Sequence, residues 1–140
     1  MKTRLLIAVA ILVGMIASSS AQREKVRPRD PDWTAPLRAA DRTNPLADRQ
    51  EVADGGRKLF HQRCSMCHGD DAEGTSWGPD LTTRAVQAQS DGELFWKITS
   101  GNTRTGMPTF SFLPELQRWQ LVLHLRGQAS GSGANNAPSR

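Results

Sequence analysis

The residues best suited to chemistry in this sequence are two cysteines and the histidine that follows them, in the segment HQRCSMCHGDD. Cys64 and Cys67 are the only cysteines of the chain and have the spacing Cys-x-x-Cys, and His68 comes directly after the second one. Thiols this close together can form a redox-active disulfide, supply half of a metal site, or attach covalently to a haem. The rest of the sequence has to distinguish these three chemistries.

Two of the three chemistries lack partners that they need. A dithiol oxidoreductase places Cys-x-x-Cys at a strand-to-helix junction, and no stretch alternates with period two for long enough to predict a strand. A structural zinc site needs four ligands, and the chain has no second pair of cysteines. Cys-x-x-Cys-His is instead the signature of c-type haem attachment. In that chemistry Cys64 and Cys67 bond to the haem vinyl groups and His68 binds the iron.

A second axial ligand can be sought among the methionines. Met1 and Met15 lie in an N-terminal segment that is expected to be removed, and Met66 lies between the two cysteines, on the side of the haem that His68 occupies. Met107 remains, after a Gly-containing stretch and before a proline. The alternative for Met107 is an ordinary core position, which is the usual place of a single methionine. The other histidines, at positions 61 and 124, are expected to face solvent and to be partly exposed on the last helix, respectively.

Three helices are predicted to position these residues, and no strand is predicted. The first covers roughly residues 48–62. The second is SDGELFWKITSG, with a capping box of Ser90 and Glu93 and a stop at Gly101. The third is LPELQRWQLVLHLRG, which is expected to end at Gly127. Its apolar face is expected to comprise Leu116, Trp119, Val122 and Leu123. The predicted fold class is therefore all-α.

The segments at the two ends differ in composition from the part between them. Residues 1–21 have two basic residues, an apolar run and then small residues, which is the layout of a secretory signal peptide cleaved after Ala21. An uncleaved membrane anchor is the alternative. Residues 22–47 are rich in Pro and Arg and predict an extended linker, and residues 128–140 predict a disordered tail. Residues 48–127 remain as one exported, periplasmic domain that is small enough to need a cofactor for its core.

The charge of the chain argues against nucleic acid as a partner. The formal net charge of +4 falls to +2 when Lys2 and Arg4 leave with the signal peptide. There is no basic stripe with interleaved aromatic residues. Two haem propionates would nearly cancel the remaining charge, so no strong steering field is expected. Arg84 and Arg104 are candidate partners for the propionates, and ordinary exposure to solvent is the alternative for both.

Around Cys-x-x-Cys-His the sequence resembles the class I monohaem c-type cytochromes, which are exported bacterial proteins with His/Met-ligated haem. The resemblance covers about residues 48–127. It rests on Gly56 and Phe60 ahead of the first cysteine, on GPDL at 78–81, and on GMPTF at 106–110. It implies a cytochrome c-like fold, with three main helices and loops wrapped around one covalently attached haem c.

The resemblance also implies roles for single residues. Gly56 and Phe60 would pack against an aromatic residue of the last helix, which looks like Trp119. The carbonyl of Pro79 would accept a hydrogen bond from the proximal His68, and Met107 would be the distal ligand. The residues expected around the haem are Phe60, Pro79, Leu81 and Trp96. A place for Trp77 or Trp96 in the ordinary core is the alternative to a place beside the haem.

An iron with both axial positions filled offers no open site to oxygen or peroxide, and a thioether ligand raises its reduction potential. The expected function is therefore one-electron transfer in a bacterial periplasmic chain, without enzymatic activity, between a donor dehydrogenase and an acceptor oxidase or reductase. Two alternatives remain: a haem sensor or enzyme with a labile sixth ligand, and a tethered cytochrome subunit of a dehydrogenase. Membrane association is expected only if the N-terminal segment is not cleaved.

Overall fold

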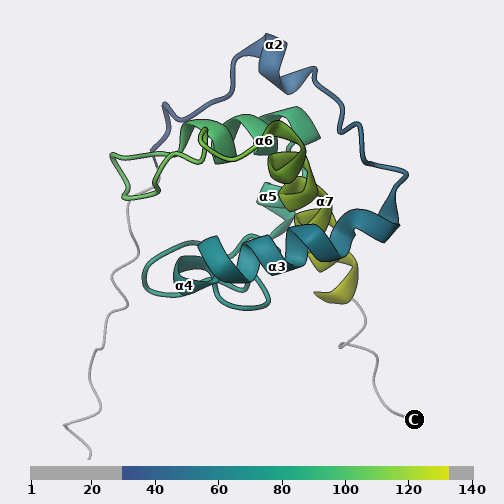
Figure 1. The fold of residues 1–140 in the computed structure, drawn as a ribbon. Helices are drawn as coiled ribbons and strands as arrows, with labels where there is room; N and C mark the ends of the chain where they lie inside the picture. Colours follow the sequence, from purple (N-terminus) through teal and green to yellow (C-terminus); the bar gives the residue numbers. More distant parts are fainter. Residues whose placement is uncertain (1–29, 133–140) are drawn as a thin grey trace, which may run out of the picture.

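The structure is a computed structural model that describes residues 30–132, so the predicted signal peptide and the end of the predicted tail lie outside the described residues. This part of the chain is helical and contains no strand, as the all-α prediction requires (Figure 1). None of the described helices is long and apolar enough to cross a bilayer. In chain order the elements are α2 (Leu37–Ala40), the 3-10 turn η2 (Gln50–Val52), α3 (Ala53–Arg63), α4 (Ser65–His68), α5 (Arg84–Gln87), α6 (Asp91–Ser100) and α7 (Glu115–Ser132).

The crossing of α3 and α7 is the main packing contact of the fold (Figure 1). Phe60 of α3 is buried there, and its ring lies 5.1 Å from the imidazole of His124 in α7, measured between centroids. Gly56 lies one turn earlier on α3, where a Cβ would overlap the backbone carbonyl of Gln120. The missing side chain therefore lets the two backbones approach closely.

Helix α6 forms where the sequence predicts it. Ser90 accepts a hydrogen bond from the backbone N–H of Glu93, and the Glu93 carboxylate accepts one from the backbone N–H of Ser90, so the predicted capping box is confirmed. The helix ends at Gly101, also as predicted. Phe95 of α6 stacks on Trp119 of α7 with ring centroids 4.0 Å apart, which ties α6 to the core.

Helix α7 differs from the prediction at both ends. It continues through Gly127 to Ser132, because one glycine weakens a helix by only about 1 kcal/mol and no neighbouring group crowds this position. Leu116 was expected on the buried face but is 60% exposed. The first turn of α7 projects beyond the core, so all of residues 115–117 face solvent. The buried face begins at Trp119 instead.

Residues 30–47, the described part of the predicted extended linker, are packed against the helices. They include the short helix α2 and three buried residues, Ala35, Asn44 and Leu46. The Asn44 side chain donates to the Trp119 carbonyl at 3.1 Å, and the carbonyl of Ala40 accepts a hydrogen bond from the Ser90 hydroxyl at 2.7 Å. Figure 1 shows this blue segment arching over α6 before the chain turns down into α3. The segment is therefore bonded both to the start of α6, at Ser90, and to α7, at Trp119.

Candidate haem site

The two cysteines lie where α3 passes into α4. Cys64 occupies the junction and Cys67 lies within the single turn of α4, and both are free thiols that are partly buried. Burial, with a smaller contribution from Cys67, raises the pKa of the Cys64 thiol to about 12. Redox-active cysteines have lowered pKa values and are thiolates near neutral pH. The environment of Cys64 is the opposite of that, which argues against the dithiol chemistry.

His68 is buried and held in one orientation. Its Nδ1 lies 2.9 Å from the carbonyl oxygen of Pro79, so the hydrogen bond that the resemblance implies is present. Because a carbonyl oxygen can only accept, Nδ1 carries the proton and Nε2 keeps its lone pair. Burial lowers the pKa of His68, against the smaller opposite effect of the Pro79 carbonyl, and keeps the ring neutral. A neutral imidazole with an oriented Nε2 is the form that binds a metal.

The loop of residues 69–81 places the Pro79 carbonyl beside this ring. It is closed by hydrogen bonds from the Thr75 hydroxyl to the Cys67 carbonyl, at 2.6 Å, and from the Leu81 N–H to the Ala72 carbonyl, at 2.8 Å. A Cβ at Gly78 would lie 2.7 Å from the Cys67 carbonyl oxygen and 3.0 Å from two atoms of the His68 ring. Only glycine leaves room for the ring at this position.

Met107 lies in a tight turn between α6 and α7. Its backbone exchanges two hydrogen bonds of 2.9 Å with Asn102, which is buried. The turn is also fixed to the end of α6, where the Thr109 hydroxyl donates to the Thr99 carbonyl at 2.7 Å. The Met107 side chain is partly buried against the core. The turn is therefore ordered by contacts of the protein itself.

The other residues that were predicted to surround the haem differ in how deeply they are buried. Phe60 is in the core and Leu81 packs against it, whereas Trp96 is half-buried on α6. Trp77 is 63% exposed. Arg104, a candidate partner of a propionate, forms ion pairs with two aspartates at the start of the described chain, as discussed below.

The structure confirms the expectation for His61 and corrects those for His124 and Trp119. His61 is exposed as expected and lies 3.3 Å from a carboxylate oxygen of Asp70. His124 was expected to be partly exposed but is buried, and it takes the place opposite Phe60 that the resemblance assigned to Trp119. Trp119 stacks on Phe95 instead. The sequence does contain a signal for the burial of His124, because it is the only polar residue of the run LVLHL, residues 121–125.

The residues present fit a covalently attached haem. Two free thiols flank one helical turn, and the histidine after them has its Nδ1 occupied by a carbonyl, which leaves Nε2 for iron. Within residues 30–132 no group of three or more His, Cys, Asp or Glu side chains converges to hold a metal ion directly, as a zinc site would require. The two free thiols and the oriented His68 are the donors that a covalently attached haem requires.

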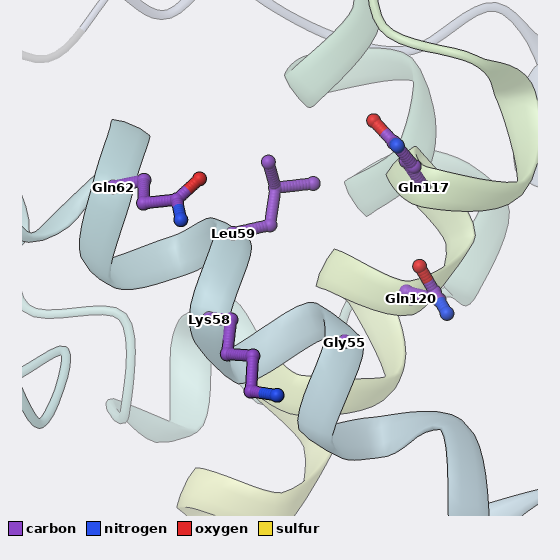
Figure 2. A pocket seen from close by; sticks show the side chains of 6 residues that line it. All are labelled: Gly55, Lys58, Leu59, Gln62, Gln117 and Gln120. Atoms are coloured by element: carbon purple, nitrogen blue, oxygen red, sulfur yellow. The ribbon is translucent and has the colours of Figure 1, made fainter.

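A pocket of about 220 Å³ lies on the surface between α3 and α7. Figure 2 shows that side chains from both helices surround it. Its lining residues are Gly55, Lys58, Leu59, Gln62, Gln117 and Gln120. None of the predicted haem ligands is among them, so the pocket is separate from the set formed by the two cysteines and His68.

The chain is similar to a known protein family and to a solved structure. A family model described as cytochrome c oxidase, cbb3-type, subunit III matches residues 51–125, which is more than half of the chain. The crystal structure of cytochrome cL from the marine methylotrophic bacterium Methylophaga aminisulfidivorans is similar, with 26% sequence identity and a TM-score of 0.53. The similarity covers 70% of this chain and 77% of that one. No curated protein matches the sequence.

Proposed function

The chain belongs to the c-type cytochrome family described as cytochrome c oxidase, cbb3-type, subunit III, and we propose that it carries single electrons in a bacterial periplasmic chain, with His68 and Met107 as the axial ligands of its iron. As a monohaem c-type cytochrome it carries one covalently bound haem c, which supplies a one-electron couple. It is an electron-transfer protein rather than an enzyme, and its partners are redox proteins. The periplasmic location is supported by the signal-like composition of residues 1–21.

The observation that carries the proposal is the hydrogen bond of His68 to Pro79, directly after two free cysteines. Cys64 and Cys67 would anchor the porphyrin, and the Pro79 carbonyl fixes the tautomer and orientation of His68. Accepting this N–H also increases the basicity of the ligating nitrogen. Met107 is supported as the second ligand by elimination, because Met66 is 86% exposed and lies between the two cysteines.

Visible spectroscopy of the haem-loaded protein tests the ligand assignment. The oxidised protein should be low-spin with a weak Met-to-iron band in the far red, and the reduced protein should not bind carbon monoxide. Met107→Ala should abolish the far-red band, lower the reduction potential and allow carbon monoxide to bind. Met66→Ala is the matched control, because it removes the other described methionine at an exposed position. A far-red band that survives in Met107→Ala would show that another residue is the sixth ligand.

A fixed subunit of a larger redox complex is the second candidate, and the description of the matching family as an oxidase subunit favours it. A freely diffusing carrier binds its partners transiently and in a salt-sensitive way, whereas a subunit stays bound. The tagged protein should therefore be purified from its native cells at low and at high salt. A stoichiometric complex that survives high salt would favour the subunit, and a monomeric cytochrome would favour the carrier.

A further inference from the structure

The turn that carries Met107 is held by a second set of contacts, from the first residues that the structure describes. Trp33 donates a hydrogen bond from its indole Nε1 to the carbonyl of Gly101, at 2.8 Å. Its ring is also packed against α6, where the ammonium nitrogen of Lys97 lies 4.7 Å from the ring centroid. Trp33 therefore joins the N-terminal segment to the residue at which the Met107 turn begins.

Asp30 contacts the same turn through its carboxylate. The Asp30 side chain is only 9% exposed, so its charge needs partners. It accepts a hydrogen bond from the Asn102 side chain at 3.2 Å, and Arg104 lies 3.5 Å from its other oxygen. Asn102 is the residue whose backbone pairs with Met107. The carboxylate thus contacts Asn102, at the start of the turn, and Arg104, within the turn.

Asp32 offers a comparison within the same segment. It also approaches Arg104, at 3.7 Å, but its side chain is 84% exposed. An exposed ion pair of this kind contributes little, because water and salt screen it. The hold on the turn therefore comes from Asp30 and Trp33 and not from the acidic character of the segment as a whole.

We propose that Asp30 and Trp33 are positioning residues that keep the Met107 turn closed, and so set how often Met107 is released from the iron. The inference rests on the proposed ligation by Met107. We expect release of the methionine to displace the turn, and such a displacement would strain the bonds that Trp33 and Asp30 make to Gly101 and Asn102. Their hydrogen bonds go to Gly101 and Asn102, so we expect them to act on the ligand through the turn.

Imidazole binding to the oxidised, haem-loaded protein tests the proposal, because imidazole can bind only after Met107 has left. The variants are Trp33→Phe, which keeps a ring over Lys97 but removes the indole N–H, and Asp30→Ala, which removes the carboxylate. A lost hydrogen bond worth roughly 1 kcal/mol predicts about a fivefold faster binding rate for Trp33→Phe, and the charged Asp30 predicts about tenfold. Asp32→Asn is the matched control and should bind at the wild-type rate.

Two results would overturn the proposal: one would reject the positioning role of Asp30 and Trp33, and the other would reject Met107 as the ligand. If Met107→Ala abolishes the far-red band but both variants bind imidazole at the wild-type rate, Met107 is the ligand and the two residues do not position it. If Met107→Ala keeps the band, the ligand assignment itself is wrong and the proposal fails with it. Far-ultraviolet circular dichroism of each variant at the assay temperature confirms that the helices are intact.

Discussion

Gly56 of α3 lies directly against the backbone carbonyl of Gln120 in α7, so no side chain separates the two helices at their crossing. The Cβ of His124 would be the next neighbour of any side chain placed there, at 3.1 Å. Both obstacles belong to α7, and one of them is backbone, which cannot move aside without moving the helix. The crossing therefore depends on the absence of a single methyl group.

Gly56→Ala is expected to destabilise the folded protein by about 3 kcal/mol, at the upper end of the usual cost of overpacking. Chemical denaturation of the haem-loaded protein measures the free energy of unfolding. Gly127→Ala is the control in the same helix pair, because nothing lies within 4 Å of a Cβ at position 127. There the better helix propensity of alanine should stabilise the protein by about 1 kcal/mol. Equal effects of the two substitutions would contradict the close crossing.

Burial of His124 predicts a pH dependence of stability. Burial first, and then electrostatic interaction with His61 and Arg57, both on α3, lower the pKa of His124 below its usual value of about 6.5. As pH falls below about 6.5 the unfolded chain gains a proton that the folded protein does not yet accept, so stability decreases until the lower folded pKa is reached. Above about pH 6.5 the protonation of His124 has no effect on the free energy of unfolding. Unfolding free energies measured between pH 7.5 and pH 5 should show the loss.

The contribution of His124 can be separated from that of the neighbouring histidine. His124→Phe keeps a ring against Phe60 and should make the acid side of the stability profile flatter. His61→Gln removes an exposed histidine instead and should leave most of the slope in place. A profile that is flattened only by His61→Gln would assign the titration to the surface residue.

Gly78→Ala tests the packing around the proximal ring. Its Cβ would meet the His68 ring and the Cys67 carbonyl, and the predicted cost of this overpacking is about 1–3 kcal/mol in unfolding free energy. Displacing the ring should also weaken its hydrogen bond to Pro79, and a less basic ligand stabilises oxidised iron less well. The reduction potential is therefore expected to rise, which protein-film voltammetry measures. Ser76→Ala, at an exposed position in the same loop, should change neither quantity.

Asn44 tests whether the segment before α3 is part of the cooperative fold. Its side chain donates to the Trp119 carbonyl and accepts from the backbone N–H of Leu46 at 2.9 Å, and all three residues are buried. Asn44→Ala would leave the Leu46 N–H without this partner, at a cost of about 1–3 kcal/mol. Thr43→Ala, one residue earlier and exposed, should stay within about 0.5 kcal/mol of wild type. If both variants unfold like wild type, the segment contributes nothing to the cooperative unit.

The features that the sequence could predict depend on residues that are close together along the chain. The capping box of Ser90 and Glu93 spans one helical turn, and the grouping of Cys64, Cys67 and His68 spans five residues. The hydrogen bond from His68 to the Pro79 carbonyl also falls within one loop, and the family resemblance predicted it. Local spacing fixes such features before any tertiary contact forms, and they are therefore readable from a single sequence.

The features that the sequence could not predict depend on helix phase and on backbone partners. Leu116 continues the apolar pattern of α7, but only the depth of the helix in the core decides that its first turn is exposed. His124 and Trp119 are both candidates for the place opposite Phe60, and the crossing geometry selects His124. Asn44 and Trp33 bind main-chain carbonyls, which every residue possesses, so no pattern of residue types marks their partners.

The segment of residues 30–47 also has a consequence for the order in which the protein folds. Its hydrogen bonds from Trp33 to Gly101, between Asp30 and Asn102, and from Asn44 to Trp119 join positions 68, 72 and 75 residues apart. Loops of this length are entropically costly to close, and contacts of high sequence separation slow folding. We expect the arm to dock after α6 and α7 have assembled, because the carbonyls of Gly101 and Trp119 that it binds must first be in place. Because Trp33 bonds to the end of α6 and Asn44 bonds to α7, we expect loss of the arm to lower the stability of the whole helical unit.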